Sequence, residues 1–279
     1  MPGDFRESRV LGRSGLTVGR LGLGSSYGAP AAAYEQAFDR GCNFFYWGSI
    51  RRDGMGEAIR HLAMRHREKL VLVLQSYSRW GTMLPRGIES GLRRLKLDYA
   101  DILLLGWHNK PLPASLMDAA MRLKEAGRVR HLAVSGHNRL MFQQYAGDNR
   151  LDVLMARYNA AHRGAATQVF PRLQVHGEPK PGVVAYTATR WGTLLDPRLT
   201  PAGRRTPTAA DCYRFVLSNP DVDVCLTGPA TAQQLEANLK ALELGPLAED
   251  EMRWMREVGD HVHERTAKSW RNPFMQRTQ

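Results

Sequence analysis

Two short apolar segments of this chain end in side chains that could take part in chemistry, Tyr46 and Gln75. Arg51 lies five residues after Tyr46, and His108 follows a third apolar segment. Tyrosine and histidine can donate protons, and histidine titrates near neutral pH. A guanidinium binds anions but keeps its proton near neutrality, whereas a glutamine amide orients a carbonyl group. These residues, with Tyr77 as a further proton donor, predict a site that binds a small molecule and transfers a proton.

The same residues also allow purely structural interpretations. Tyr46 could fill the space at the end of a strand, and Arg51 could be a solvated loop charge. His108 could be hydrogen-bonded to the backbone of a loop. The chemical and the structural interpretation both stay open for these residues. Which one holds depends on the strands and loops that position the side chains.

Short apolar segments alternate along the chain with segments of helical spacing. The predicted strands are Leu21–Gly24, Asn43–Tyr46, Leu70–Ser76, Asp101–Gly106, His131–Gly136, Val153–Asn159, Val183–Thr187 and Val222–Gly228. The predicted helices are Ala31–Arg40, Met55–Arg67, Arg86–Leu95, Leu116–Ala126, Arg139–Ala146, Thr208–Leu217 and Ala232–Leu244. Eight such units predict an α/β fold, a closed (β/α)8 TIM barrel, in which the carboxyl ends of the strands form the mouth of the active site.

The two ends of the chain add elements to this barrel. Residues 9–18 are typical of a β-hairpin turning at Arg13–Gly15, which would close the barrel floor. Ala248–Thr266 has the spacing of an extra C-terminal helix. We expect one domain over residues 1–279, with a core at about 9–245 and the helix and a basic tail at 246–279. The tail either folds over the mouth or is disordered.

Composition limits the possible partners. The chain has 279 residues, 43% of them hydrophobic, and a formal net charge of +12. Such a charge attracts polyanions, but the basic residues are dispersed without a run of five, so specific nucleic-acid binding is not expected. A phosphate-bearing cofactor or an anionic small-molecule substrate would explain part of the excess.

The cysteines and the apolar segments indicate the cellular compartment in which the protein is expected. The three cysteines lie far apart, which predicts neither a disulfide framework nor a thiolate metal site. The N-terminal residues lack the apolar core of a signal peptide, and no apolar run approaches the roughly 18 residues that cross a bilayer. We therefore expect a cytoplasmic protein without a metal or a membrane span.

Several motifs, in order and spacing, resemble the aldo-keto reductases from about Arg9 to Leu244. They are Leu11–Val18, Leu21–Gly24, Gly41–Phe45, Leu95–Asp101, Ala133–Ser135, Tyr158–Asn159, Val184–Thr187, and Gly228 with Gln234–Leu239. Each motif alone is weak, and together they support the barrel assignment.

The resemblance implies hydride transfer from a reduced nicotinamide to a carbonyl group. In that family a tyrosine donates the proton, a lysine paired with an aspartate lowers its pKa, and a histidine orients the carbonyl. All four positions are changed here. Tyr46 stands at the aspartate position, Arg51 at the tyrosine, Gln75 at the lysine and Gly106 at the histidine, with His108 two residues later. A remodelled site is predicted, with Tyr46, Arg51, Gln75 and His108 as its catalytic candidates.

The resemblance also implies a nicotinamide site at the later strand ends. Tyr186 matches the aromatic platform that stacks on the nicotinamide, although it could be a core residue. Ser135 and Asn159 match positions that hydrogen-bond the carboxamide. The loop with Thr187, Thr189 and Arg190 would wrap a pyrophosphate, or it is an ordinary βα loop.

The last predicted strand leads into a helix whose N-terminus would favour a phosphate group. This segment supplies the candidates Gly228, Ala230, Gln234 and Asn238. Relatives often carry cations at the positions of Ala230 and Gln234 to hold a 2′-phosphate, and those charges are missing here. NADPH is the cofactor expected from the resemblance, and NADH remains open.

Three functions are consistent with these residues. The first is a nicotinamide-dependent oxidoreductase with a remodelled site acting on a carbonyl or other unsaturated substrate. The second is a catalytically silent member that binds a nucleotide or a partner. The third is a non-redox enzyme that uses Arg51, Arg190 and His108 on an anionic small molecule.

Overall fold

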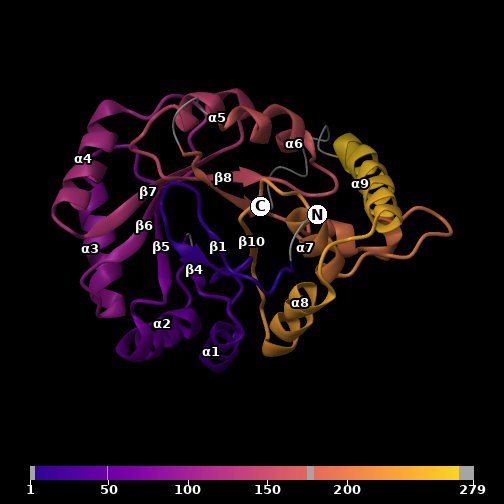
Figure 1. The fold of residues 1–279 in the computed structure, drawn as a ribbon, viewed down its shortest axis with the longest axis horizontal. Helices are drawn as coiled ribbons and strands as arrows, with labels where there is room; N and C mark the ends of the chain where they lie inside the picture. The colour runs from indigo at the N-terminus through magenta and orange to yellow at the C-terminus, as the bar shows by residue number, and fades with distance from the viewer. Residues whose placement is uncertain (1–3, 49, 175–178, 270–279) are drawn as a thin grey trace.

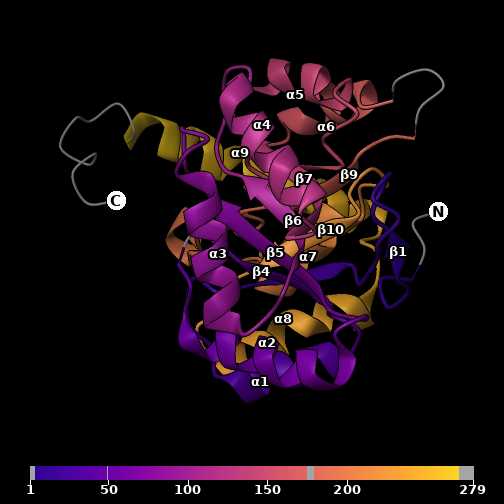
Figure 2. The same ribbon diagram turned by 90° about the vertical axis from the view of Figure 1, so that its left-hand side faces the viewer.

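Eight parallel strands form a closed barrel surrounded by helices in the computed structural model, which describes residues 4–48, 50–174 and 179–269 (Figures 1 and 2). The strand order around the barrel is β10-β3-β4-β5-β6-β7-β8-β9. The predicted (β/α)8 fold is confirmed. The strands are β3 Leu21–Gly24, β4 Phe44–Trp47, β5 Val71–Ser76, β6 Ala100–Leu105, β7 Val129–Gly136, β8 Val153–Arg157, β9 Gly182–Tyr186 and β10 Val224–Thr227.

The helices follow the predicted segments to within a few residues. They are α1 Ala31–Asp39, α2 Asp53–His66, α3 Leu84–Leu95, α4 Ala114–Glu125, α5 Arg139–Ala146, α7 Ala209–Leu217, α8 Ala232–Leu244 and the C-terminal α9 Glu249–Ser269. Four short elements were not predicted: α6 Gly164–Gln168 and the 3-10 helices η1 Phe170–Arg172, η2 Thr193–Leu195 and η3 Pro197–Leu199. All four lie in the loops that follow β8 and β9, where no long apolar periodicity marks them.

Alternation along the strands decides which side chains face the barrel interior. In β5, Val71 and Val73 belong to the interior cluster, whereas Leu72 and Leu74 pack against the helices. Both faces are thus buried, which explains why the strand is continuously apolar. The next interior position of β5 after Val73 is Gln75, which therefore lies at the mouth. The same alternation brings side chains from the other strands to the mouth.

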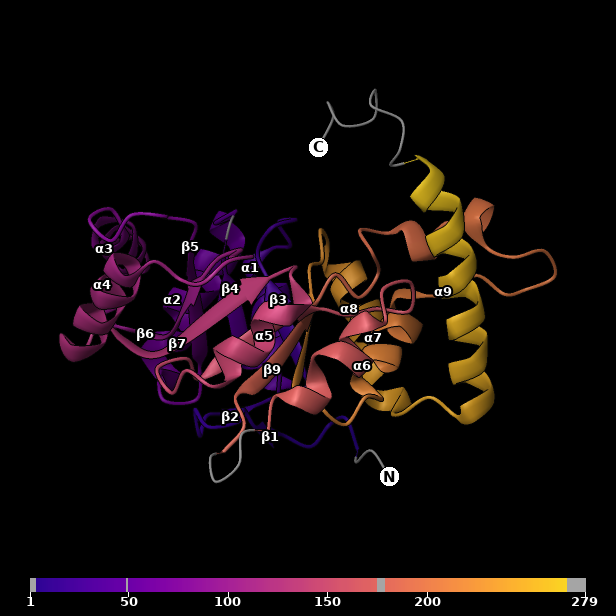
Figure 3. The same cartoon turned by 90° about the horizontal axis from the view of Figure 1, so that it is seen from above.

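The N-terminal hairpin closes the opposite end of the barrel (Figure 3). Its strands are β1 Arg9–Val10 and β2 Thr17–Val18, and Leu11 and Val18 are buried in the interior cluster. Gly12 has a φ of 47°, and a β-carbon there would lie 2.1 Å from the backbone nitrogen of Gly182. Only glycine permits this approach of the two backbones. The predicted hairpin at the barrel floor is confirmed. Because it closes this end, a ligand can enter only at the opposite end of the barrel.

The C-terminal helix α9 packs outside the barrel, beside α7 and the segment after β9 (Figure 3). Arg214 of α7 forms an ion pair with Glu251, with a separation of 2.9 Å, and Trp254 Nε1 donates to the carbonyl oxygen of Arg205. The extra helix is thus confirmed, and the end of the predicted basic tail, 270–279, lies outside the described residues. Over the described ranges, no helix is long and apolar enough to cross a bilayer.

Candidate active site

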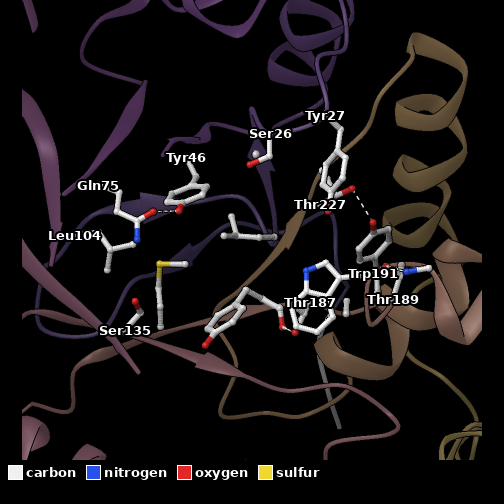
Figure 4. A pocket seen from close by; sticks show the side chains of 18 of the residues that line it. Ser26, Tyr27, Tyr46, Gln75, Leu104, Ser135, Thr187, Thr189, Trp191 and Thr227 are labelled. Carbon is white, nitrogen blue, oxygen red and sulfur yellow. Dashed lines mark hydrogen bonds between the residues drawn. The ribbon is translucent and has the colours of Figure 1, made fainter. Parts of the chain in front are cut away.

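A cavity of about 690 Å³ opens at the carboxyl ends of the strands, and Figure 4 shows its lining. This volume is typical of small-molecule sites. The lining comprises Gly24, Ser26, Tyr27, Tyr46, Gln75, Tyr77, Leu104, Trp107, Ser135, His137, Met155, Tyr186, Thr187, Ala188, Thr189, Trp191, Gly192, Tyr213, Leu226, Thr227, Gly228, Ala230 and Gln234. We call this cavity the central pocket.

The central pocket is aromatic and almost free of charge. Its lining, as far as the described residues form it, contains no lysine, arginine, aspartate or glutamate, in a chain of net charge +12. Tyr27, Tyr77, Trp107 and Trp191 stand at its rim, each with about half of its surface exposed. Exposed aromatic side chains around a cavity offer flat contact surface to a ligand. The central pocket therefore favours an uncharged or planar ligand group.

Tyr46 and Gln75 meet inside the central pocket. Tyr46 follows the inward-facing Phe44 on β4, and Gln75 follows the inward-facing Val73 on β5. The Tyr46 hydroxyl donates a hydrogen bond to Gln75 Oε1 (Figure 4). This contact orients a phenol, which can donate a proton, beside an amide that carries two further donors.

Two glycines make room for this pair. A β-carbon at Gly48 would lie 2.0 Å from Cζ of the Tyr46 ring, so the ring occupies space that any other residue would need. A β-carbon at Gly106 would lie 2.2 Å from Gln75 Nε2 and 2.8 Å from Cδ1 of Tyr77. Position 106 is the one at which the resemblance places a histidine. The side chains of Gln75 and Tyr77 therefore fill the volume in which that histidine would stand.

Arg51 lies outside the central pocket, contrary to the expectation of an anion clamp at the mouth. Its Nη2 donates to the backbone oxygen of Gln75 at 3.1 Å, and its guanidinium lies over the Trp47 ring. A β-carbon at Gly91 of α3 would lie 3.2 Å from Arg51 Nη1, so the guanidinium occupies a gap beneath that helix. Burial, and next the charge of Arg94, lower the Arg51 pKa.

His108 also turns away from the central pocket. The side chain is buried, and its Nε2 accepts a hydrogen bond from Arg79 Nη1 at 2.8 Å. Burial, and then the charge of Arg79, lower its pKa to about 4. His108 is therefore neutral at pH 7 with its Nε2 engaged, so the geometry does not support its predicted role as a proton donor.

Tyr186 and Ser135 reach the central pocket from β9 and β7. The Tyr186 hydroxyl donates to the Gly136 backbone oxygen at 3.3 Å, and burial raises its pKa. Ser135 Oγ accepts from the Trp107 backbone nitrogen at 2.9 Å. The His137 ring stacks on the Tyr186 ring with centroids 6.2 Å apart and an interplanar angle of 23°. The tyrosine ring is thus held as a firm wall of the pocket.

The loop after β9 has an unusual backbone. Thr187, Arg190 and Trp191 have φ values of 60°, 52° and 53°, in the left-handed region that bulky side chains rarely adopt. Thr187, Thr189 and Trp191 line the central pocket, and Trp107, on the opposite rim, has a φ of 55°. Backbone strain of this kind clusters at functional sites, where packing enforces it.

Arg190 of that loop points away from the central pocket, which corrects its predicted place around a pyrophosphate. The side chain is buried, and its Nη1 donates to the backbone oxygen of Val262 on α9 at 3.2 Å. Burial, followed by the charge of Arg157, lowers the Arg190 pKa. The left-handed backbone turns this arginine outward while it presents Trp191 at the rim.

Two asparagines predicted to contact a cofactor lie behind the wall instead. Asn159 is fully buried, donates from Nδ2 to the Thr187 backbone oxygen at 2.8 Å, and accepts from the Ala161 nitrogen. Asn238 of α8 is buried and donates from Nδ2 to Thr227 Oγ1 at 2.8 Å. Neither lines the central pocket. Their amides hold the wall in place because each is engaged within the protein.

The wall after β10 contains three predicted residues, Gly228, Ala230 and Gln234. Gln234 Oε1 accepts from the Ala230 backbone nitrogen at 2.8 Å, and the Thr231 side chain caps α8. A β-carbon at Gly228 would lie 2.7 Å from the Tyr27 ring, so glycine lets that ring close over the loop. These contacts shape a neutral wall beside the start of α8.

A nicotinamide dinucleotide is the group that this architecture implies, and the lining fits it in part. The Tyr186 ring offers an aromatic platform, Thr187 and Thr189 line the pocket after β9, and Gly228 and Ala230 line it just before the N-terminus of α8. No cation in the lining matches a 2′-phosphate. The central pocket therefore fits the nicotinamide and pyrophosphate parts better than a phosphorylated ribose.

Several lining residues were not among the predicted site residues. Tyr27 lies in the loop after β3, and Tyr213 on α7 accepts a hydrogen bond from Thr227 Oγ1. Trp107 and Trp191 owe their positions to left-handed backbone. Among the described residues, no group of three or more histidine, cysteine or acidic side chains could hold a metal ion.

The chain is similar to known proteins in sequence and in fold. The model of the aldo/keto reductase family matches residues 16–210. L-galactose dehydrogenase of Arabidopsis thaliana is 24% identical over 88% of this chain and 91% of its own length. An uncharacterized oxidoreductase of Bacillus subtilis is also 24% identical, over 90% of this chain and 95% of its own.

Solved structures share the barrel. An aldo-keto reductase from Bacillus halodurans, in its holo form, superposes with a TM-score of 0.74 at 20% identity, covering 90% of this chain and 96% of its own. An aldo/keto reductase from Klebsiella pneumoniae in complex with NADP and acetate gives a TM-score of 0.73 at 20% identity, covering 91% and 96%. At this identity, the likeness establishes the fold.

Proposed function

Because the chain belongs to the aldo/keto reductase family, we propose that it is a nicotinamide-dependent oxidoreductase in which Tyr46 is the proton donor. The observation that carries this proposal is the Tyr46–Gln75 pair inside the central pocket, where Tyr186 also lines the wall. The substrate class is a carbonyl or other unsaturated compound. The uncharged aromatic lining favours substrates without a charge on the reacting part.

A reduced nicotinamide, when bound, supplies a hydride to the substrate carbon. Tyr46 turns its hydroxyl from Gln75 to the substrate oxygen and donates its proton there. Gln75 holds the hydroxyl in place beforehand through its Oε1. Arg51, bonded to the Gln75 backbone, carries a charge that interacts favourably with ionised Tyr46. A cation behind the phenol thus helps to stabilise the phenolate.

Cofactor selectivity follows from the missing charges. A 2′-phosphate gains most of its binding energy from arginine or lysine side chains. The segment around Ala230 and Gln234 offers an amide and backbone groups only. We therefore expect NADPH to bind no more tightly than NADH, and we expect Ala230→Arg to create a preference for NADPH.

The two other functions receive less support. A non-redox enzyme using Arg51, Arg190 and His108 would need these side chains in the central pocket, and each points elsewhere. A catalytically silent nucleotide-binding protein would share the wall around Tyr186 but would not need Tyr46 beside Gln75. Turnover is therefore the property that separates the two remaining functions.

The test is a titration of the protein with NADH and NADPH, followed by quenching of tryptophan fluorescence, with Trp107 and Trp191 at the rim as reporters. Bound reduced cofactor is then mixed with a panel of aldehydes, ketones and enones, and its absorbance is followed. Binding with turnover supports the proposal. Binding without oxidation of the cofactor across the panel would favour the silent protein, and no binding at millimolar cofactor would reject both.

A further inference from the structure

A second, charged recess adjoins the central pocket behind His137. Its lining comprises Gly136, His137, Arg139, Phe142, Ala156, Arg157, His162, Ala165 and Val169, from the ends of β7 and β8 and from α5 and α6. An open groove of about 540 Å³ continues from it along Arg139, Gln168 and Arg172. We call the two together the cationic recess. His137 lines both the recess and the central pocket.

Arg157 stands at the carboxyl end of β8 and lines this recess. Its neighbour Ala156, which packs on the helix side of the barrel, lines the recess too. Arg157 is also the register partner of Tyr186 on β9. A partly buried arginine here must displace water from one side of its guanidinium. A counter-charge or an anionic ligand would offset the cost of burying this guanidinium.

Ion pairs of these arginines are absent among the residues that the structure describes. Within the described residues, no carboxylate lies within 4.0 Å of a guanidinium nitrogen of Arg157, Arg139 or Arg172. Burial lowers the pKa of Arg157, the Tyr186 hydroxyl opposes this effect, and the charge of Arg139 adds to it. Three arginines therefore line the cationic recess, and no acid of the described part of the chain pairs with them.

Local contacts hold part of this group in place. Arg139 Nε donates to Gln168 Oε1 on α6, which leaves the terminal nitrogens of Arg139 to other partners. A β-carbon at Gly164 would lie 2.8 Å from Arg139 Cζ, so a glycine on α6 makes room for the guanidinium. Arg139 and Gln168 are both exposed, so this hydrogen bond orients the guanidinium at the open side of the recess.

His162, which also lines the recess, supplies an independent observation. Its Nδ1 is buried without a hydrogen-bond partner, and buried polar atoms normally have one. Burial, and then the charges of Arg157 and Arg190, lower the pKa of His162 to about 3, so the ring is neutral at pH 7. A neutral imidazole can still donate one hydrogen bond to an anion.

We propose that the cationic recess binds a small oxyanion, the carboxylate or phosphate group of a ligand, through Arg157 and Arg139 with His162 Nδ1 as a further donor. The enclosed part has a volume of only about 10 Å³, room for one oxygen atom, and the open groove takes the rest of the group. Guanidinium groups bind carboxylate and phosphate in a bidentate manner. The site does not depend on the redox function of the central pocket.

Isothermal titration calorimetry and thermal unfolding with inorganic phosphate, and separately with acetate, test the proposal at ionic strength held constant with chloride. Arg157→Gln is compared with Arg86→Gln, an equal change of charge at an exposed residue of α3. We expect Arg157→Gln to weaken oxyanion binding by about tenfold or more, because it removes a charge-assisted hydrogen bond. Wild type and Arg86→Gln should bind alike.

The same samples give a second readout. Without an oxyanion, Arg157→Gln should unfold at a temperature no lower than wild type, because the substitution removes repulsion from the recess. Arg139→Gln repeats the test should Arg157→Gln fail to fold. A response to phosphate alone assigns a phosphate group, and a response to acetate assigns a carboxylate. Equal binding by all variants, or no binding to wild type, would overturn the proposal.

Discussion

The wall of the central pocket formed by β4, β5 and β6 uses its polar groups differently from the wall formed by the β9 and β10 loops. In the first wall, Tyr46 and Gln75 meet each other within the cavity. In the second wall, the amides of Asn159 and Asn238 are bonded behind the surface, and Tyr186 and hydroxyl groups face the cavity. The first wall is suited to proton transfer, and the second to shape and stacking.

Glycines make room for the large side chains in and behind the first wall. Gly48 leaves space for the Tyr46 ring, Gly106 for the Gln75 amide and Gly91 for the Arg51 guanidinium. The first wall is thus packed closely around its polar residues, and three glycines accommodate them.

The largest expected effect belongs to the first wall. Tyr46→Phe should lower kcat by about a hundredfold or more, because removal of a general acid usually costs that much. The Kd for the reduced cofactor should change less than about twofold. Steady-state kinetics and fluorescence titration measure the two values. Tyr77→Phe, which removes a hydroxyl from the rim, is the matched control and should retain activity.

An intermediate effect is expected in the second wall. Tyr186→Ala should weaken cofactor binding by about tenfold, since the ring offers a stacking surface worth about 1 kcal/mol beyond simple burial. Tyr77→Ala, on an exposed aromatic of the other side, should leave the Kd unchanged. Fluorescence titration checks both variants. An equal loss of cofactor affinity in Tyr186→Ala and Tyr77→Ala would mean that cofactor binding is not confined to the second wall.

The smallest effect on activity is expected outside both walls. His108→Gln should change kcat by less than about twofold, because His108 faces Arg79 rather than the central pocket. We expect His108 to affect the pH dependence of the free energy of unfolding instead. The folded pKa is lowered from 6.5 to about 4, so its stabilising contribution is present above pH 6.5 and is lost as pH falls toward 4.

Denaturant unfolding between pH 7 and pH 4 measures this contribution. Wild type should lose on the order of 1 to 3 kcal/mol more free energy of unfolding than His108→Gln over that range. Glutamine keeps an acceptor for Arg79 but does not titrate, which makes it the matched variant. Identical acid sensitivity in both proteins would show that His108 is not held neutral by its surroundings.

Sequence reasoning placed the strand residues well and the loop arginines poorly. Tyr46, Gln75 and Tyr186 lie on strands, whose two-residue period fixes their direction, and all three line the central pocket. Arg51 and Arg190 sit in loops, and their long side chains follow local contacts, a gap at Gly91 and a carbonyl of α9. Such contacts arise only when distant segments pack.

The rim shows the same limit. Trp107 and Trp191 reach the mouth through left-handed backbone that no local sequence rule predicts for tryptophan. The fold could be predicted because it depends on apolar segments that repeat along the whole sequence. The cationic recess was not predicted, because Arg157 and Arg139 come together only through the neighbouring loops after β7 and β8.

A double-mutant cycle on Tyr46 and Gln75 tests most directly whether these residues form one proton-donating unit. The rate of hydride transfer in a single turnover is measured for wild type, Tyr46→Phe, Gln75→Leu and the double variant, with Ser26→Ala as a control elsewhere in the lining. If Gln75 acts through the Tyr46 hydroxyl, the double variant should be no slower than Tyr46→Phe alone. This account would be contradicted if the rate losses of Tyr46→Phe and Gln75→Leu multiplied in the double variant. It would also be contradicted if Tyr46→Phe transferred hydride as fast as wild type.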